Sequence, residues 1–354
     1  MRSVNRPFGT LPDGREAMLF TFRNGNGYEL SVTNYGGIIT SCKGPDREGN
    51  VDELTLAFDT LEEYLRGHPF YGSTVGRVAN RIEGAGFTVH GSYHAISPHP
   101  SPEVHLHGGK NGFHTKLWQA EEVHPDRSSA GVELSLVSPD GDEGYPGELS
   151  VTVTISLSED NRLEFRYRAE SDKATPVNLT NHTYWNLAGG GKILDHWIRL
   201  YASTMVETDN LQLPTGRLLP VEGTPFDLRT ITRIGERIGA VTRSAAKGFD
   251  DCYFIDGWES DGADENLVPA AELRDPKSGR VMEVATSYPG VQFYTGNNLP
   301  GQRDREGRTL SGQEALCLET QFLPDSVHHP SFPNTILEPG TVYTHRTVHR
   351  FSTS

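Results

Sequence analysis

Two side chains of the sequence are of the types that exchange protons with a bound molecule. Glu319 follows the apolar run at 315–318, and strand alternation places its carboxylate on the same face as Cys317. A carboxylate pressed against an apolar strand is costly unless it is paired, so it indicates a partner or a chemical task. His182 is the one group in the segment VNLTNHTYWNLAGG that titrates near neutral pH. A carboxylate and an imidazole together can act as general base and general acid.

The segment around His182 is rich in hydrogen-bonding groups. If residues 177–190 are extended, one side of the strand carries Asn178, Thr180, His182, Tyr184 and Asn186. A buried face of this polarity needs hydrogen-bond partners. A bound sugar would supply them, and so would a network within the protein. Both interpretations are open at this point.

A second pair of imidazoles lies in the segment VHLHGG. Alternation predicts that His105 and His107 share one face of a strand while Leu106 faces the other way. Gly108 and Gly109 allow the chain to turn tightly beside them. The pattern is compatible with catalysis, with a pair of metal ligands, or with two exposed histidines.

Three further segments carry polar groups between glycine or proline turns. Asn80 and Arg81 in GRVANRI combine donors and acceptors that suit vicinal hydroxyls, although a surface loop with an ion pair would look the same. Asp250 in GFDD and Gln292 in PGVQFYTGNN add a carboxylate and a carboxamide. None of the three segments is specific on its own.

The elements that must hold these groups are predicted to be strands. The run LSVTVTISL at 149–157 alternates strictly, as does RLEFRYRAE at 162–170, and turn-forming residues separate them, which predicts an antiparallel hairpin. Shorter runs of the same kind recur along the whole chain. Helical signals are few: a capping box at Thr60 and Glu63, and the spacing of Ile231, Ile234 and Ile238 after Thr230. We expect an all-β fold, a large antiparallel β-sandwich with a few short surface helices, as one domain over residues 1–354.

Composition narrows the classes of partner. The 354 residues carry a formal net charge of −15, which repels nucleic acid and anionic membrane surfaces and favours a neutral small molecule. Three cysteines without paired spacing argue against a disulfide framework. We find no signal-peptide pattern, no run of 18 apolar residues and no glycine-rich phosphate loop, so we expect a cytoplasmic protein without a nucleotide cofactor.

Taken in order, the motifs GRVANRI, HLHGG, NLTNHTYWNLAG, GFD, PGVQFYTGN and LCLETQ closely resemble the aldose 1-epimerase (galactose mutarotase) family, from about Asn34 to Phe351. The resemblance implies a galactose mutarotase-like supersandwich and interconversion of the α and β anomers of free hexoses such as glucose and galactose, without cofactor or metal. It also implies Glu319 as base, His182 as acid and His107 as a second imidazole near the ring oxygen. The residues that would hold sugar hydroxyls are Asn80, Arg81, His107, Tyr184, Asp250 and Gln292.

The chain departs from the family pattern at three positions, which leaves the preferred hexose open. His114 stands where Asp is usual, Asp251 where His is usual and His105 where Asn is usual.

We expect a carboxylate such as Glu319 or Asp250 to keep His182 protonated toward neutral pH.

Other functions remain compatible with the sequence. One is a non-catalytic sugar-binding module of the same fold, and another is a metal-dependent, cupin-like β-sandwich enzyme with His105, His107 and Glu319 as ligands. The absence of an Arg or Lys cluster near the motifs argues against a phosphosugar substrate. Monomer and homodimer are both open.

Overall fold

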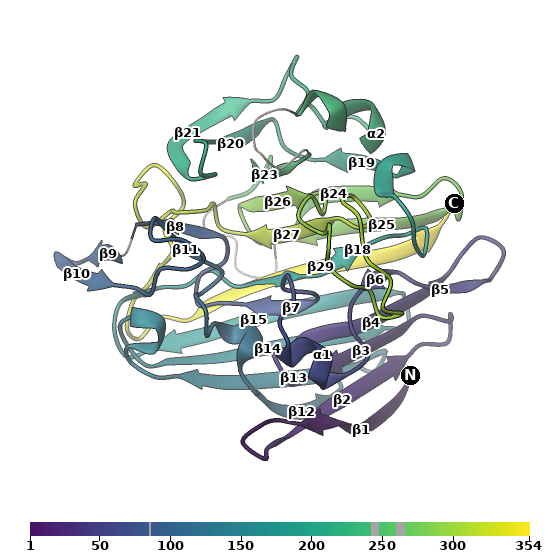
Figure 1. Ribbon diagram of the computed structural model, residues 1–354, viewed down its shortest axis with the longest axis horizontal. Helices are drawn as coiled ribbons and strands as arrows, with labels where there is room; N and C mark the ends of the chain where they lie inside the picture. Colours follow the sequence, from purple (N-terminus) through teal and green to yellow (C-terminus); the bar gives the residue numbers. More distant parts are fainter. Residues whose placement is uncertain (85, 242–247, 260–265) are drawn as a thin grey trace.

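The computed structural model describes residues 1–84, 86–241, 248–259 and 266–354, and these residues form mainly β-strands (Figure 1). The predicted hairpin is confirmed as β14 (Leu149–Ser158) and β15 (Arg162–Ser171), with Val153 opposite Tyr167. Along β15 buried and exposed side chains alternate almost without exception. The apolar residues of both strands therefore face a single core.

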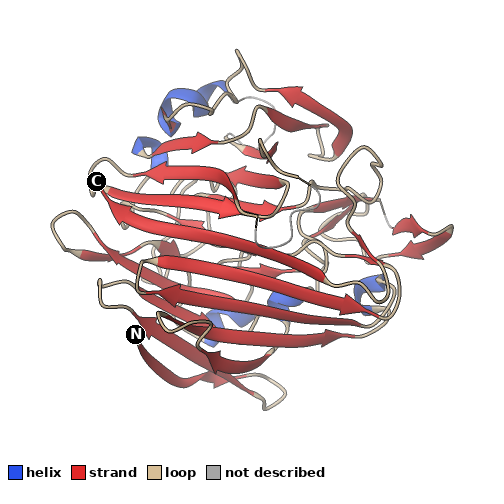
Figure 2. Ribbon diagram, turned by 180° about the vertical axis from the view of Figure 1, so that it is seen from behind, coloured by secondary structure: helices blue, strands red, loops and turns tan. Residues whose placement is uncertain are grey.

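This hairpin belongs to a nine-stranded antiparallel sheet, which Figure 2 shows as long strands running side by side across the back of the molecule. The order of its strands is β12 (Gln119–Val123), β13 (Ser129–Ser138), β14, β15, β29 (Tyr343–Thr353), β25 (Arg280–Thr286), β24 (Val268–Arg274), β19 (Trp197–Leu200) and β22 (Thr232–Arg233).

Two five-stranded sheets face the nine-stranded sheet. The first consists of β1 (Arg2–Thr10), β2 (Glu16–Arg23), β3 (Glu29–Thr33), β4 (Ile38–Pro45) and β5 (Val51–Glu53). The second, which we call the site sheet, has the order β21 (Pro214–Pro220), β20 (Thr204–Thr208), β23 (Asp250–Phe254), β26 (Gly290–Tyr294) and β27 (Cys317–Gln321). One hydrophobic core joins all three sheets, with Val32, Val153 and Phe293 among its members. The three sheets therefore form a sandwich around a shared core.

Short two-stranded pairs complete the β-structure. They are β9 (Gly86–Val89) with β10 (Ser92–Ala95), β8 (Arg81–Glu83) with β11 (Val104–Leu106), β7 (Ser73–Val75) with β17 (Thr180–His182), β6 (Thr55–Leu56) with β18 (Tyr184–Trp185), and β16 (Thr175–Pro176) with β28 (Ile336–Leu337). Because β17 also contacts β27, the segment that carries His182 is laid against the site sheet.

The helices are short, as expected, but they begin differently from the prediction. Helix α1 covers Leu61–Leu65, and the Thr60 hydroxyl bonds the Glu63 carboxylate instead of a backbone amide, so the predicted capping box is not formed. Helix α2 covers Ile234–Arg237 and begins after strand β22, so Thr230 does not cap it. The remaining helical turns are η1 (Phe113–Thr115), η2 (Asp142–Gly144), η3 (Ile193–Asp195) and η4 (Ile238–Ala240).

Cys42, Cys252 and Cys317 are buried and free, which confirms that these cysteines form no disulfide. Within the described ranges, none of the helices has the length and apolarity needed to cross a bilayer.

Candidate active site

Three neighbouring strands of the site sheet present polar side chains to one cavity. Asp250 begins β23, Gln292 lies in the middle of β26, and Glu319 lies directly opposite Gln292 on β27. The cavity has a volume of about 150 Å³. Tyr294, at the end of β26, also lines it. The rest of the lining comes from other parts of the chain, including β8 and β11: Pro69, Phe70, Asn80, Arg81, Leu106, His107, His182, Tyr184 and Asn298. All eight site residues expected from the sequence line this one cavity.

Glu319 and His182 are a buried pair. Glu319 Oε1 lies 3.6 Å from His182 Nε2, and only 3% and 6% of the two side chains are exposed. Glu319 Oε2 has no hydrogen-bond partner among the residues that the structure describes. Side chains that are 137 residues apart in the chain are thus brought within reach of a single small molecule.

Burial governs the protonation of this pair. It raises the pKa of Glu319 well above its usual value and lowers the pKa of His182 to about 4, because each charged form loses its hydration. Our expectation that a nearby carboxylate keeps His182 protonated toward neutral pH is therefore wrong, because desolvation outweighs the attraction. The neutral pair and the ion pair contain the same number of protons, and one proton transfer between the two side chains interconverts them.

Aromatic rings and a thiol hold the His182 imidazole in place. The ring stacks on Tyr184 at 5.0 Å and on Phe70 at 5.7 Å between centroids. Its second nitrogen, Nδ1, lies 3.5 Å from Cys317 Sγ. Nε2 is therefore the nitrogen that remains available to Glu319 and to the cavity.

His107 is held as a hydrogen-bond donor. The Asn80 backbone N–H donates to His107 Nδ1 at 3.2 Å. Burial keeps the pKa of His107 well below its usual value, so the ring is neutral. A neutral imidazole that accepts at Nδ1 carries its hydrogen on Nε2.

The same tautomer bears on metal binding. Ligand atoms of His107, His182 and Glu319 all lie within 4.8 Å of one another. A metal would need a lone pair on His107 Nε2, which is the nitrogen that carries hydrogen while Nδ1 accepts the backbone bond. The donor set therefore suits an oxygen acceptor of a ligand better than a metal ion.

His105 does not share a face with His107, which corrects the prediction from alternation. His107 has a φ of +52°, and this left-handed residue ends the period of β11, so that Leu106 and His107 both line the cavity. The His105 ring is buried elsewhere, with Nδ1 2.6 Å from the Ser97 carbonyl oxygen and Nε2 2.8 Å from the Tyr145 hydroxyl. The proposed metal ligand set of His105, His107 and Glu319 is therefore not assembled.

The five polar side chains on one side of the segment around His182 divide between the two roles left open above, ligand contact and an internal network. His182 and Tyr184 line the cavity. Asn178 Nδ2 donates to the Phe322 carbonyl, Thr180 Oγ1 to that of Thr320, and Asn186 Nδ2 to that of Glu314. Two of the five side chains thus face a possible ligand, and three form an internal network.

Hydrogen bonds link the amide, carboxylate and guanidinium side chains at the cavity. Gln292 Nε2 donates to Asp250 Oδ1 at 2.7 Å, and the buried Gln292 Oε1 has no hydrogen-bond partner in the described part of the chain. Gln212 bonds both Arg81 and Asp250, although it does not line the cavity. The sequence patterns single out neither Gln212 nor Phe70.

Two positions that depart from the family pattern lie behind the cavity lining. The His114 ring contacts Phe70 with centroids 4.7 Å apart. Asp251 is buried, and its carboxylate accepts from the Asp250 backbone N–H at 3.2 Å. Both can affect the ligand only through a residue that lines the cavity.

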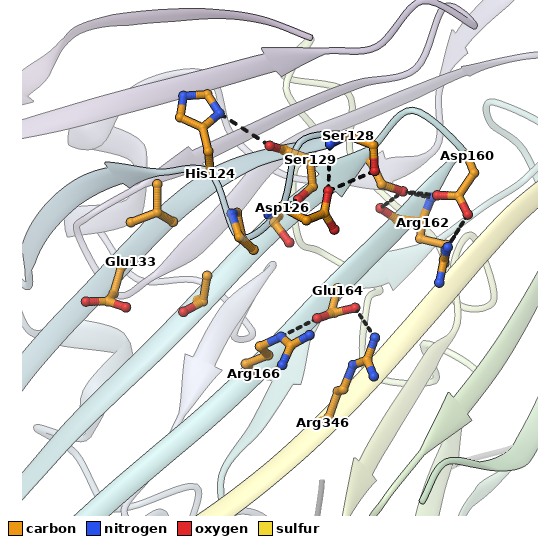
Figure 3. Close-up of a pocket in the computed structure, with 15 residues that line it drawn as sticks. His124, Asp126, Ser128, Ser129, Glu133, Asp160, Arg162, Glu164, Arg166 and Arg346 are labelled. Carbon is orange, nitrogen blue, oxygen red and sulfur yellow. Dashed lines mark hydrogen bonds and ion pairs between the residues drawn. The ribbon is translucent and has the colours of Figure 1, made fainter. Parts of the chain in front are cut away.

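A different hollow, on the outer face of the nine-stranded sheet, is lined by charges that already pair with one another (Figure 3). Asp160 bonds Arg162, and Glu164 bonds both Arg166 and Arg346. This hollow lacks the unpaired buried acceptors that mark the cavity on the site sheet.

Comparisons with known proteins find relatives over nearly the whole chain. The family model described as aldose 1-epimerase matches residues 18–350. Galactose mutarotase of Rattus norvegicus is 40% identical over 99% of both chains, and aldose 1-epimerase of Escherichia coli K12 is 34% identical over 98% of this chain and 99% of its own.

Solved structures are similar over the same length. Galactose 1-epimerase from Lactobacillus acidophilus NCFM matches with a TM-score of 0.85 and 25% identity, over 100% of this chain and 99% of the other. The GalM/aldose epimerase homologue from C. elegans matches with a TM-score of 0.84 and 28% identity, over 94% of this chain and 98% of the other. This chain belongs to the aldose 1-epimerase family.

Proposed function

We propose that the protein is an isomerase, an aldose 1-epimerase that interconverts the α and β anomers of free hexoses such as glucose and galactose. The observation that carries the proposal is the buried Glu319–His182 pair, whose unpaired carboxylate oxygen lies at a cavity of about 150 Å³ lined by further polar groups. Glu319 Oε2 and Gln292 Oε1 are buried acceptors on adjacent strands that lack donors. Hydroxyl groups are the donors that would satisfy them.

The reaction needs two proton transfers and no other reagent. In ring opening, Glu319 as carboxylate removes the proton from the anomeric hydroxyl, the C1–O5 bond breaks, and His182 as imidazolium delivers a proton to O5. The side chains then stand as carboxylic acid and neutral imidazole, which is the state that burial favours. Rotation about C1–C2 and the reverse transfers give the other anomer and restore both groups.

The neighbouring side chains have supporting roles in this proposal. His107 donates its Nε2 hydrogen near the ring oxygen, where negative charge develops as the C1–O5 bond breaks. Asn80, Arg81, Tyr184, Asp250 and Gln292 hold the other hydroxyls, so that the ring stays between base and acid.

Polarimetry on freshly dissolved α-glucose and α-galactose tests the function. We expect the protein to speed the change in optical rotation, and E319Q or H182N to lower kcat by about 10² to 10⁴-fold, because each removes one positioned proton-transfer group. E272Q is a matched control, since Glu272 is a buried carboxylate on β24 that is paired with Arg274. Wild-type protein that binds hexose and leaves its rotation at the spontaneous rate would instead be a sugar-binding module.

We also propose that residues 1–354 form one domain, that the protein acts in the cytoplasm as a monomer or homodimer, and that it binds neither nucleic acid nor membranes. The family match over 18–350 and the net charge of −15 support these points. Sedimentation analysis of the purified protein tests the oligomeric state, and limited proteolysis that released a stable fragment would contradict a single domain.

A further inference from the structure

Gln212 lies outside the cavity lining but contacts two residues that form it. Arg81 Nη2 donates to Gln212 Oε1 at 2.6 Å, and Gln212 Nε2 donates to Asp250 Oδ2 at 2.6 Å. A guanidinium can only donate and a carboxylate can only accept, so the two partners fix which end of the amide faces each of them. The Gln212 carboxamide is therefore a neutral bridge between two opposite charges.

A specific turn places this side chain. Gln212 lies between β20 and β21, the edge strand of the site sheet and its neighbour (Figure 1). Asp209 Oδ1 accepts from the backbone N–H groups of Leu211 and Leu213 at 2.8 and 2.9 Å, and the Asp209 carbonyl accepts from the Gln212 N–H at 3.1 Å. Gln212 has a φ of +61°, an uncommon conformation for a residue with a side chain. Its surroundings must hold it there, and strain of this kind accumulates at functional sites.

The bridge replaces an ion pair that would compete with a ligand. Arg81 and Asp250 both line the cavity, yet these two described residues form no direct ion pair, and each bonds the Gln212 amide instead. The other Asp250 oxygen accepts from Gln292 Nε2, so neutral amides hold both oxygens. Without the amide of Gln212, attraction would draw the guanidinium onto the carboxylate, and each would satisfy the other in place of a hydroxyl.

We infer that Gln212 is a positioning residue for sugar binding: its carboxamide holds Arg81 and Asp250 apart and keeps both turned toward one region of the sugar. The inference rests on the proposed function, because it takes a hexose as the ligand. It predicts that Gln212 acts on the recognition of particular hydroxyls, whereas proton transfer by Glu319 and His182 depends on it much less.

The variant Q212L tests this inference, because it keeps a similar volume and loses both hydrogen bonds. KM and kcat are measured by polarimetry for glucose, galactose and their 2-, 3-, 4- and 6-deoxy analogues. We expect KM for the full hexoses to rise about tenfold or more while kcat changes less than about threefold, since hydrogen bonds to charged groups are among the stronger ones. For the deoxy sugar that lacks the hydroxyl held by Arg81 and Asp250, we expect wild type and Q212L to have equal KM.

Two controls separate positioning from general damage. L211A changes the neighbouring side chain of the same turn, which is 52% exposed, and should leave KM unchanged. Thermal unfolding of Q212L shows whether the variant is folded. An equal loss for every sugar, or an unchanged KM for all of them, would overturn the inference.

Sugar affinity measured by calorimetry on the same set of sugars separates the two hypotheses. If wild type binds hexoses without speeding mutarotation, the proposed function fails and the calorimetric pattern for Q212L still decides the role of Gln212. If wild type is active and Q212L shows no selective loss, only the inference about Gln212 fails.

Discussion

At the scale of single residues, the protonation state of Glu319 and His182 depends on a balance between loss of hydration and mutual attraction. Both groups lose hydration, which favours the neutral forms, while the 3.6 Å separation favours the ion pair. A bound hydroxyl that donates to Glu319 Oε2 would stabilise the carboxylate and shift the balance toward the ion pair. Substrate itself would then create the protonation state that starts ring opening.

This balance predicts a wide bell-shaped pH profile for kcat/KM. At low pH both groups are protonated and the base is lost, whereas at high pH both are deprotonated and the acid is lost. Because burial lowers the pKa of His182 to about 4 and raises that of Glu319, the acid limb should lie below the ordinary histidine value and the basic limb above the ordinary glutamate value. Because the two groups are coupled, the apparent pKa values of the two limbs belong to the pair and not to either residue alone. Polarimetric rates from pH 4 to 9 measure them, and an acid limb centred near pH 6.5 would contradict this view of the site.

The sequence was sufficient to name the main polar residues of the cavity, but not the rest of its lining or their environment. Motif resemblance identified Glu319 and His182, and the structure places them together. The prediction that the side chains of His105 and His107 share one face was wrong. Alternation assumes an extended chain, and the left-handed conformation of His107 ends the extended segment. The role of Gln212 depends on contacts to Arg81, 131 residues away, and no local pattern encodes such a contact.

At the scale of elements, the placement of His107 depends on close contact between two backbone segments. Gly108 has a φ of +80°, and a Cβ there would lie 1.8 Å from the Gly76 carbonyl oxygen. Only glycine allows this approach without moving the chain. The turn after β11 is thereby fixed, and His107 with it.

The variant G108A should therefore displace His107 and lower kcat/KM by about tenfold to a hundredfold, since a shift of about 1 Å near the reacting atoms can cost this much. G84A is the matched control: Gly84 has a φ of +70° with no atom within 4 Å of a Cβ. It should cost only the left-handed backbone penalty of about 1–2 kcal/mol and keep full activity. Polarimetry and urea unfolding of both variants measure these effects, and equal losses of activity would show that the close approach to Gly76 is unimportant.

Long strands with a regular hydrophobic alternation were predicted well, whereas the starts of the short helices were not. The strands β14 and β15 alternate over ten residues each, and this pattern fixes which face is buried. Helix α2 has four residues, and its start is decided by the pairing of the preceding strand β22 with β19. Tertiary contacts override so weak a local preference.

At the scale of the whole molecule, the sandwich packs two histidines against aromatic rings outside the cavity lining. Strand β29 pairs with both β15 and β25, near the middle of the nine-stranded sheet, and carries His345 and His349. Burial lowers the pKa of both side chains to about 3. The acid sensitivity of the fold is thus expected to come from its core as well as from its active site.

His349 allows this expectation to be tested. Its ring lies between Phe165 and Trp185, with centroids 5.5 and 5.4 Å away, and none of the described residues forms a hydrogen bond with its Nδ1. In the unfolded chain a histidine has a pKa of about 6.5, so the unfolded state binds the extra proton first. The stabilisation is complete above about pH 6.5 and is lost as the pH falls toward the folded value of about 3, by up to about 1.4 kcal/mol per pH unit.

H349F should lose this one titration and still fill the space between the two rings. Between pH 8 and 5, its free energy of unfolding in urea should fall by about 2 kcal/mol less than that of wild type. H90N, which changes an imidazole that is 67% exposed, is the control and should keep the wild-type slope. Parallel curves for wild type and H349F would mean that His349 takes up its proton without unfolding. The neutral core histidine would then not be a source of the acid sensitivity of this fold.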